Sequence, residues 1–194
     1  MTIIQIGSNH GNDDLSGIIK ENKSDIRNLI LVEPIALHHA ALVKRYSGFP
    51  MTIKQCAIVD DPKTSEVSFY YHREDGPLYE VASLSREHIL KHSVFNPRLT
   101  LDGIVESRVS AMTINNLFRQ HEIKVVDLLM IDAEGFDERI IRSVEFETFK
   151  ILNIVYENLH IDTAATTCFL EAKGYSVIQN WGTNGWSSWA FLNI

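Results

Sequence analysis

The stretch Thr2–Gly11, TIIQIGSNHG, decides the fold class of this chain. A short apolar run ends in a glycine-rich turn with the spacing G-x-N-x-G, and a helical pattern begins near Asp13. Glycines let a backbone turn sharply and approach a ligand closely, while the N-terminus of the following helix offers free N–H groups. A buried strand that leads through such a turn into a helix is typical of an α/β unit.

A second short apolar run, Leu29–Val32, is followed at once by Glu33 and Pro34. A carboxylate at the end of the second strand of a Rossmann-like unit commonly accepts hydrogen bonds from a ribose diol. The alternative is that Glu33 is only a solvated carboxylate at a strand end. Its position after the glycine turn favours the ribose, so the two segments together predict a nucleoside-containing ligand.

Further carboxylates follow two later strands. Asp132 and Glu134 come directly after the apolar strand Val125–Ile131, and Glu157 and His160 lie at the end of a strand at about 152–157. In an open α/β sheet, ligands bind outside the carboxyl ends of the strands, so these side chains are expected around one cleft. His160 suits a general acid or base because its ordinary pKa lies near neutrality.

We predict no metal site, because the acidic residues at these strand ends lack a compact ligand spacing. A version of the site in which Asp132, Glu134 and Glu157 offer oxygen ligands to Mg²⁺ remains an alternative. Ser83, Ser85 and His88 indicate first a helix cap, with a role in acceptor binding as the alternative.

The overall composition excludes several classes of protein. The 194 residues carry 18 Lys and Arg against 25 Asp and Glu, a net charge of −7, which argues against a nucleic-acid partner. No apolar run approaches the roughly 20 residues that span a bilayer. Met1–Gly7 does not resemble a signal peptide, and Cys56 and Cys168 form no disulfide framework. We expect a single soluble, cytoplasmic domain over residues 1–194.

The ordered set of segments resembles the FkbM-type methyltransferases. The resemblance rests on QIGSNHGNDD, LILVEP, QCAIVDD, ASLSREHILKH, MTINNLF, VDLLMIDAEGFDERIIRSVEF, IVYENLH and LEAKGYSVI, and it covers nearly the whole chain. It implies a Rossmann-like class I methyltransferase fold, with a seven-stranded, mostly parallel sheet, an antiparallel last strand, and helices on both faces. It also implies S-adenosylmethionine as cofactor and a hydroxyl of a sugar or secondary metabolite as acceptor.

The resemblance also assigns roles to residues of this sequence. It places the cofactor against Gly7, Ser8, Asn9, Gly11, Glu33, Pro34, Cys56, Ala57 and Asp132. The candidates for proton removal are Asp132, Glu134 and His160. The acceptor, a small molecule or a glycan, would meet Glu157, Trp181 and Trp186, with the insertion at about 60–110 and the loop Trp181–Trp189 shaping its site.

Two other functions remain as alternatives. An NAD-dependent oxidoreductase shares the glycine turn and the strand-end carboxylate, but the G-x-N-x-G spacing and the absence of a Tyr-x-x-x-Lys pair disfavour it. A catalytically inactive domain of the same fold, which binds a partner or a glycan, is the second alternative.

Overall fold

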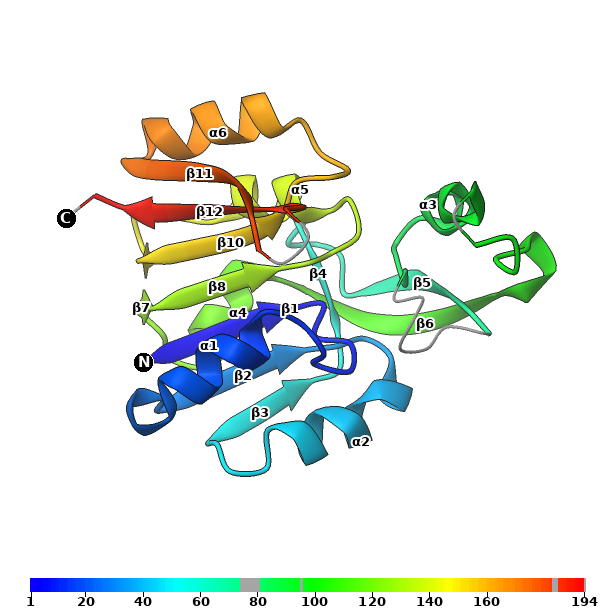
Figure 1. Cartoon of the computed structure of the whole chain (residues 1–194), viewed down its shortest axis with the longest axis horizontal. Coiled ribbons are helices and arrows are strands. Elements are labelled where there is room, and N and C mark those ends of the chain that lie inside the picture. The colour runs from blue at the N-terminus through cyan, green and yellow to red at the C-terminus, as the bar shows by residue number, and fades with distance from the viewer. Residues whose placement is uncertain (74–80, 95, 183–184, 194) are drawn as a thin grey trace.

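A seven-stranded sheet forms the centre of the molecule, in the order β11-β12-β10-β8-β1-β2-β3 (Figure 1). The computed structural model describes residues 1–73, 81–94, 96–182 and 185–193. β12 runs antiparallel to both of its neighbours, while the other strands share one direction. The strands are β1 (Thr2–Ile6), β2 (Asn28–Val32), β3 (Met51–Lys54), β8 (Leu128–Ile131), β10 (Asn153–Glu157), β11 (Tyr175–Trp181) and β12 (Ser187–Leu192). The predicted fold class is therefore confirmed.

Helices cover both faces of this sheet because successive strand residues point to opposite sides. On one face, Ile3 and Leu29 pack with Leu15 and Leu42 of the first two helices. On the other face, Ile4 of the same strand packs with residues of the last three helices. Figure 1 shows α1 in front of the sheet, with α4 and α5 behind it. The helices are α1 (Leu15–Glu21), α2 (Ala36–Arg45), α4 (Ile114–Gln120), α5 (Asp137–Ser143) and α6 (Thr163–Ala172).

The segment between β3 and α4 forms a small second sheet, of strand order β4-β6-β5. β5 and β6 pair antiparallel, from Glu66 opposite Ser110 to His72 opposite Ile104. This ribbon projects from the end of the main sheet toward which the parallel strands point, and α3 packs against it (Figure 1). Its elements are β4 (Ala57–Val59), β5 (Glu66–His72), α3 (Arg86–Lys91) and β6 (Ile104–Thr113).

The structure corrects the third strand of the sequence-based outline. Thr52–Val59 contains no Gly or Pro and predicts one strand, whereas the chain forms two. β3 pairs with β2 as far as Lys54, and β4 then pairs with β6 in the second sheet. Cys56 therefore lies between the two sheets and Ala57 begins β4, so neither residue ends a strand of the main sheet.

The short elements complete the outline. β7 (Val125–Val126) pairs with β9 (Lys150–Ile151), so the predicted strand over 125–131 is interrupted at Asp127. The turns η1 (Lys23–Asp25), η2 (His92–Val94) and η3 (Leu101–Gly103) are 3₁₀ helices. Among the residues that the structure describes, no helix is both long and apolar enough to cross a bilayer.

Candidate active site

A cavity at the carboxyl ends of β1, β2 and β8, which we call the inner cavity, collects most of the residues predicted to bind the cofactor. Its wall is completed by apolar side chains of the second sheet and of the loop before α5, among them Phe69 and Phe136. The predicted residues that line it are Gly7, Asn9, Glu33, Pro34, Cys56, Ala57 and Asp132. Strand-end loops of the main sheet thus meet the insertion at one place.

The turn after β1 requires glycine at its first position. Gly7 has a φ of +76°, and a Cβ atom there would lie 1.8 Å from the carbonyl oxygen of Asp132. Residues other than glycine rarely adopt this backbone conformation, and no side-chain atom can share the space of a carbonyl oxygen. The close approach of the β1 and β8 loops therefore depends on Gly7.

Glu33 joins the loops after β1 and β2. Its buried carboxylate accepts a hydrogen bond from the backbone N–H of Asn9 and another from the backbone N–H of Ile35, both at 2.8 Å. Each carboxylate oxygen can accept more than one hydrogen bond, so these contacts are compatible with a further donor from a ligand. Asn9 adds a buried side-chain oxygen, Oδ1, which has no hydrogen-bond partner among the described residues.

Two predicted cofactor residues shape the turn without lining the inner cavity. Ser8 is buried, and its hydroxyl donates a hydrogen bond of 3.3 Å to the backbone oxygen of Gln5. Gly11 has a φ of +70° and faces the ring of Tyr46, where a Cβ atom would approach to 2.8 Å. The structure therefore places both residues behind the turn.

A larger cleft of about 970 Å³, here the outer cleft, adjoins the inner cavity. Glu157, His160 and Trp186 line it together with His92. Three acidic residues, Asp13, Asp132 and Glu134, line both the inner cavity and the outer cleft. These carboxylates mark the junction between the two spaces.

Trp181 is not among the residues that line the outer cleft, contrary to its predicted place at the acceptor. It lies at the end of β11, with its ring centroid 6.0 Å from that of Trp189. Both tryptophans pack against the core on the α1 side of the sheet. Trp186, which is 54% exposed, is the tryptophan that reaches the cleft. Residues 183–184 of the predicted Trp181–Trp189 loop lie outside the described residues.

Two carboxyl groups beneath the cleft have pKa values above their ordinary range. Burial raises the pKa of Asp137 to about 6, against the opposing effect of backbone N–H groups that include that of Ala133 at 3.3 Å. Burial, followed by the neighbouring Asp137 carboxylate, raises the pKa of Glu157 to about 7. The Oε2 atom of Glu157 is buried without a partner in the described structure. Glu157 therefore titrates near neutrality, where a general acid or base works best.

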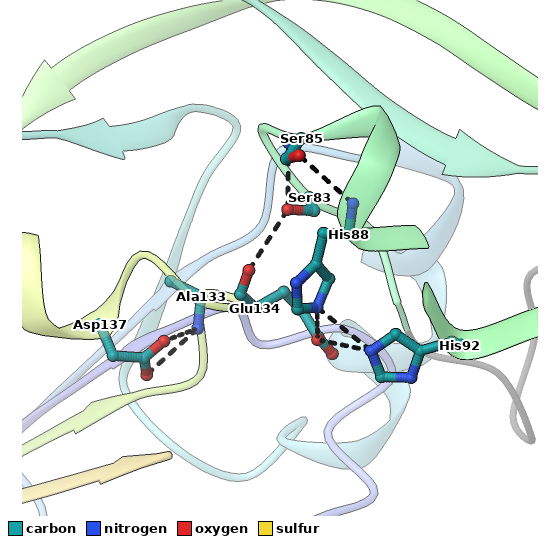
Figure 2. A network of polar contacts seen from close by, with 7 residues as sticks. All are labelled: Ser83, Ser85, His88, His92, Ala133, Glu134 and Asp137. Carbon is teal, nitrogen blue, oxygen red and sulfur yellow. Dashed lines mark hydrogen bonds and ion pairs between the residues drawn. The ribbon is translucent and has the colours of Figure 1, made fainter. Parts of the chain in front are cut away.

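Histidines from the insertion surround the side chain of Glu134. The Nε2 atom of His88 lies 2.7 Å from Glu134 Oε2, and the Nε2 atom of His92 lies 3.2 Å from that of His88. The ring centroid of His160 is 4.5 Å from that of His88. Figure 2 shows His88 and His92 directed at the Glu134 carboxylate from the α3 side.

Backbone contacts hold this group of side chains in place. The Ser85 hydroxyl accepts a hydrogen bond from the backbone N–H of His88 and so caps α3, as predicted. The Ser83 hydroxyl donates to the backbone oxygen of Glu134 at 3.3 Å (Figure 2). Glu134 itself has a φ of +49°, and Gly135 follows with +88°. This left-handed turn is how the loop after β8 presents Glu134 to α3.

Sequence reasoning missed His92 and Asp13 as site residues, whereas His88 had a role in acceptor binding as an alternative. His88 and His92 are four residues apart, and this spacing places two side chains on one face of a helix. This spacing is the sequence signal that could have placed His88 and His92 together at the site. Asp13, read as a helix cap, accepts a hydrogen bond of 2.5 Å from Gln5 Nε2, and burial raises its pKa. No local pattern distinguishes it from an ordinary first-turn carboxylate.

The family description "Methyltransferase FkbM domain" matches residues 5–177. The chain belongs to the FkbM methyltransferase family. Searches among curated proteins and among solved structures find no match. The family membership confirms the resemblance seen in the sequence, and it establishes the chain as a methyltransferase at the level of the family.

Proposed function

We propose that this FkbM-family protein is an S-adenosylmethionine-dependent methyltransferase that methylates a hydroxyl group of a sugar or another small molecule. One observation carries the proposal. The inner cavity, with its glycine turn and buried strand-end carboxylate, opens at Asp13, Asp132 and Glu134 onto a cleft large enough for a second molecule. A methyl group held at this junction would face both spaces, as its transfer from one ligand to the other requires.

The residues of the inner cavity fit S-adenosylmethionine. Gly7 allows the loops after β1 and β8 to meet at the wall of the inner cavity, and Asn9 Oδ1 is a buried acceptor suited to an amino or hydroxyl group. Glu33 would take the ribose hydroxyls, and Pro34, Cys56 and Ala57 would flank the adenine. When bound, the cofactor supplies a methyl group already activated on a sulfonium. The carboxylates at the junction suit that positive charge.

The protein's own part in the reaction is to position the acceptor and remove its proton. Holding two reactants in line can lower a barrier by roughly 7–11 kcal/mol, and a placed base adds about 10²–10⁴-fold. Asp132, Glu134 and His160 line the cleft and are the candidates for that base. Glu157 joins them because its pKa of about 7 lets it exchange a proton at neutral pH.

Calorimetric titration of the purified protein with S-adenosylmethionine, S-adenosylhomocysteine and NAD tests the proposal. Binding of both adenosyl compounds, followed by turnover on a panel of sugars and hydroxylated small molecules, is the expected result. Binding of NAD alone would refute the methyltransferase chemistry and favour an oxidoreductase. Binding of the adenosyl compounds without turnover on the panel would favour an inactive domain.

A further inference from the structure

Four side chains from three separate segments converge at the edge of the outer cleft. His88 and His92 belong to α3 and its C-terminus, Glu134 follows β8, and His160 follows β10. One ligand atom of each lies within 4.8 Å of the corresponding atoms of the other three. We call this set the histidine cluster.

Hydrogen bonds alone leave the histidine cluster poorly satisfied. If the neutral His88 ring carries its proton on Nε2, that one proton faces two acceptors. These are Glu134 Oε2, at 2.7 Å from the nitrogen, and His92 Nε2, at 3.2 Å. If His92 supplies the proton instead, the lone pair of His88 Nε2 faces a carboxylate oxygen. In either arrangement two lone pairs point toward the same place and repel each other. A cation bound there would be attracted by both.

His160 adds a further unsatisfied nitrogen. Its Nε2 atom is buried and has no hydrogen-bond partner in the described parts of the chain, although two other imidazoles lie beside it. Neutral imidazole is the form that ligates metals.

We propose that the histidine cluster binds a divalent transition-metal ion of the Zn²⁺ class, through three imidazole nitrogens and the Glu134 carboxylate. Imidazole donors suit zinc, iron, nickel and copper, whereas Mg²⁺ prefers oxygen ligands. Zn–N bonds of about 2.0–2.1 Å in a tetrahedral site separate neighbouring ligand atoms by about 3.3 Å. The separations among the ligand atoms of His88, His92 and Glu134 are 2.7, 3.2 and 3.9 Å and bracket that length, and the ligand atom of His160 lies within 4.8 Å of all three.

This ion would tie the insertion to the main sheet, because its ligands come from α3 and from the loops after β8 and β10. A consequence that rests on the proposed function follows for the choice of base. A ligand atom has its electron pair on the metal, so Glu134 and His160 would position the acceptor and leave its proton to Asp132 or Glu157. The metal site itself stands independently of the methyl-transfer activity.

Titration of the chelator-treated, tag-free full-length chain with Zn²⁺ and with Mg²⁺ tests the site. One Zn²⁺ per chain is expected, with far weaker binding of Mg²⁺. Co²⁺ should add the visible absorption bands of a nitrogen-ligated ion. Zn²⁺ at 100 times its Kd should raise the Tm by about 5–10 °C, as expected for a ligand that binds only the folded state of a chain this size.

Variants on different segments separate the cluster from other histidines. His92→Ala and His160→Ala should each weaken Zn²⁺ binding by more than about 100-fold, beyond the loss caused by removing an outer-shell partner. His121→Asn, at the end of α4 and outside the cluster, should bind as the unchanged protein does. Circular dichroism establishes that each variant is folded. Unchanged Zn²⁺ affinity in either folded cluster variant, equal loss in His121→Asn, or equal affinity for Mg²⁺ would overturn the proposal.

Discussion

The raised pKa of Glu157 makes a specific prediction about stability and pH. Glu157 lies half-buried beside the fully buried Asp137, and these surroundings raise its pKa from 4.5 to about 7. The folded state therefore binds a proton more tightly than the unfolded chain does. The contribution of Glu157 to stability therefore falls as the pH rises from about 4.5 to about 7, because over this range the unfolded chain loses its proton while the folded state keeps it.

The size of this effect follows from the two pKa values. Between pH 5 and pH 8, a group with a pKa of 4.5 unfolded and about 7 folded costs the folded state about 2.5 kcal/mol. Glu157→Gln keeps the shape of the side chain and removes the titration. The free energy of unfolding of the variant, relative to the unchanged protein, should therefore rise by about 2–3 kcal/mol from pH 5 to pH 8.

Urea unfolding at both pH values, followed by circular dichroism, measures this difference. Glu147→Gln is the matched control, because Glu147 is 91% exposed and pairs only with Lys173 at 3.4 Å among the described contacts. Its unfolding free energy should follow that of the unchanged protein at both pH values. If the curves of Glu157→Gln and the unchanged protein also run parallel, Glu157 does not have a raised pKa in the folded state, and its proposed place in proton transfer fails with it.

Three further variants test the inner cavity and the junction. Gly7→Ala should abolish cofactor binding or folding, because its Cβ would fall 1.8 Å from the Asp132 oxygen, whereas Gly17→Ala, in α1 with nothing within 4 Å, should keep or slightly raise the Tm because alanine favours a helix. Glu33→Ala should weaken S-adenosylmethionine binding by about 1.5–3 kcal/mol, the scale of a hydrogen bond to a charged group, as measured by calorimetry; unchanged affinity in the folded variant would remove its ribose role. Asp132 is exposed at the junction, so Asp132→Asn should lower turnover on an accepted substrate while it leaves the Tm almost unchanged. A loss of turnover that comes with a large fall in Tm would mean a structural role.

The part of the site that the sequence predicts well is the part made by local signals. Gly7 and Glu33 each follow a short, continuous apolar strand, and the carboxyl ends of parallel strands meet at one edge. Acidic residues favour the first turn of a helix, so the sequence predicts a helix at about Asp137–Ser143, and α5 has these bounds. These features depend on residues within a few positions of one another, so one sequence suffices to place them.

The insertion was predicted poorly because its order comes from long-range pairing. Residues 60–110 look irregular in sequence, where only Glu66–Tyr71 and Glu106–Val109 predict strands. The structure forms β6 over Ile104–Thr113, because all seven residues of β5 pair with it. Exposed and half-buried positions dominate β6, so its own pattern carries little hydrophobic signal.

The two halves of the site are therefore built in different ways, and this difference bears on function. The inner cavity is formed mainly by loops that end strands of the main sheet. The histidine cluster needs α3 to be set over the loops after β8 and β10, which the Ser83 hydroxyl does by bonding the backbone of Glu134. Change in the insertion can alter what the outer cleft accepts while Gly7, Glu33 and the sheet remain as they are. Acceptor specificity in this protein is consequently expected to follow α3 and its histidines, and cofactor specificity to follow the strand ends.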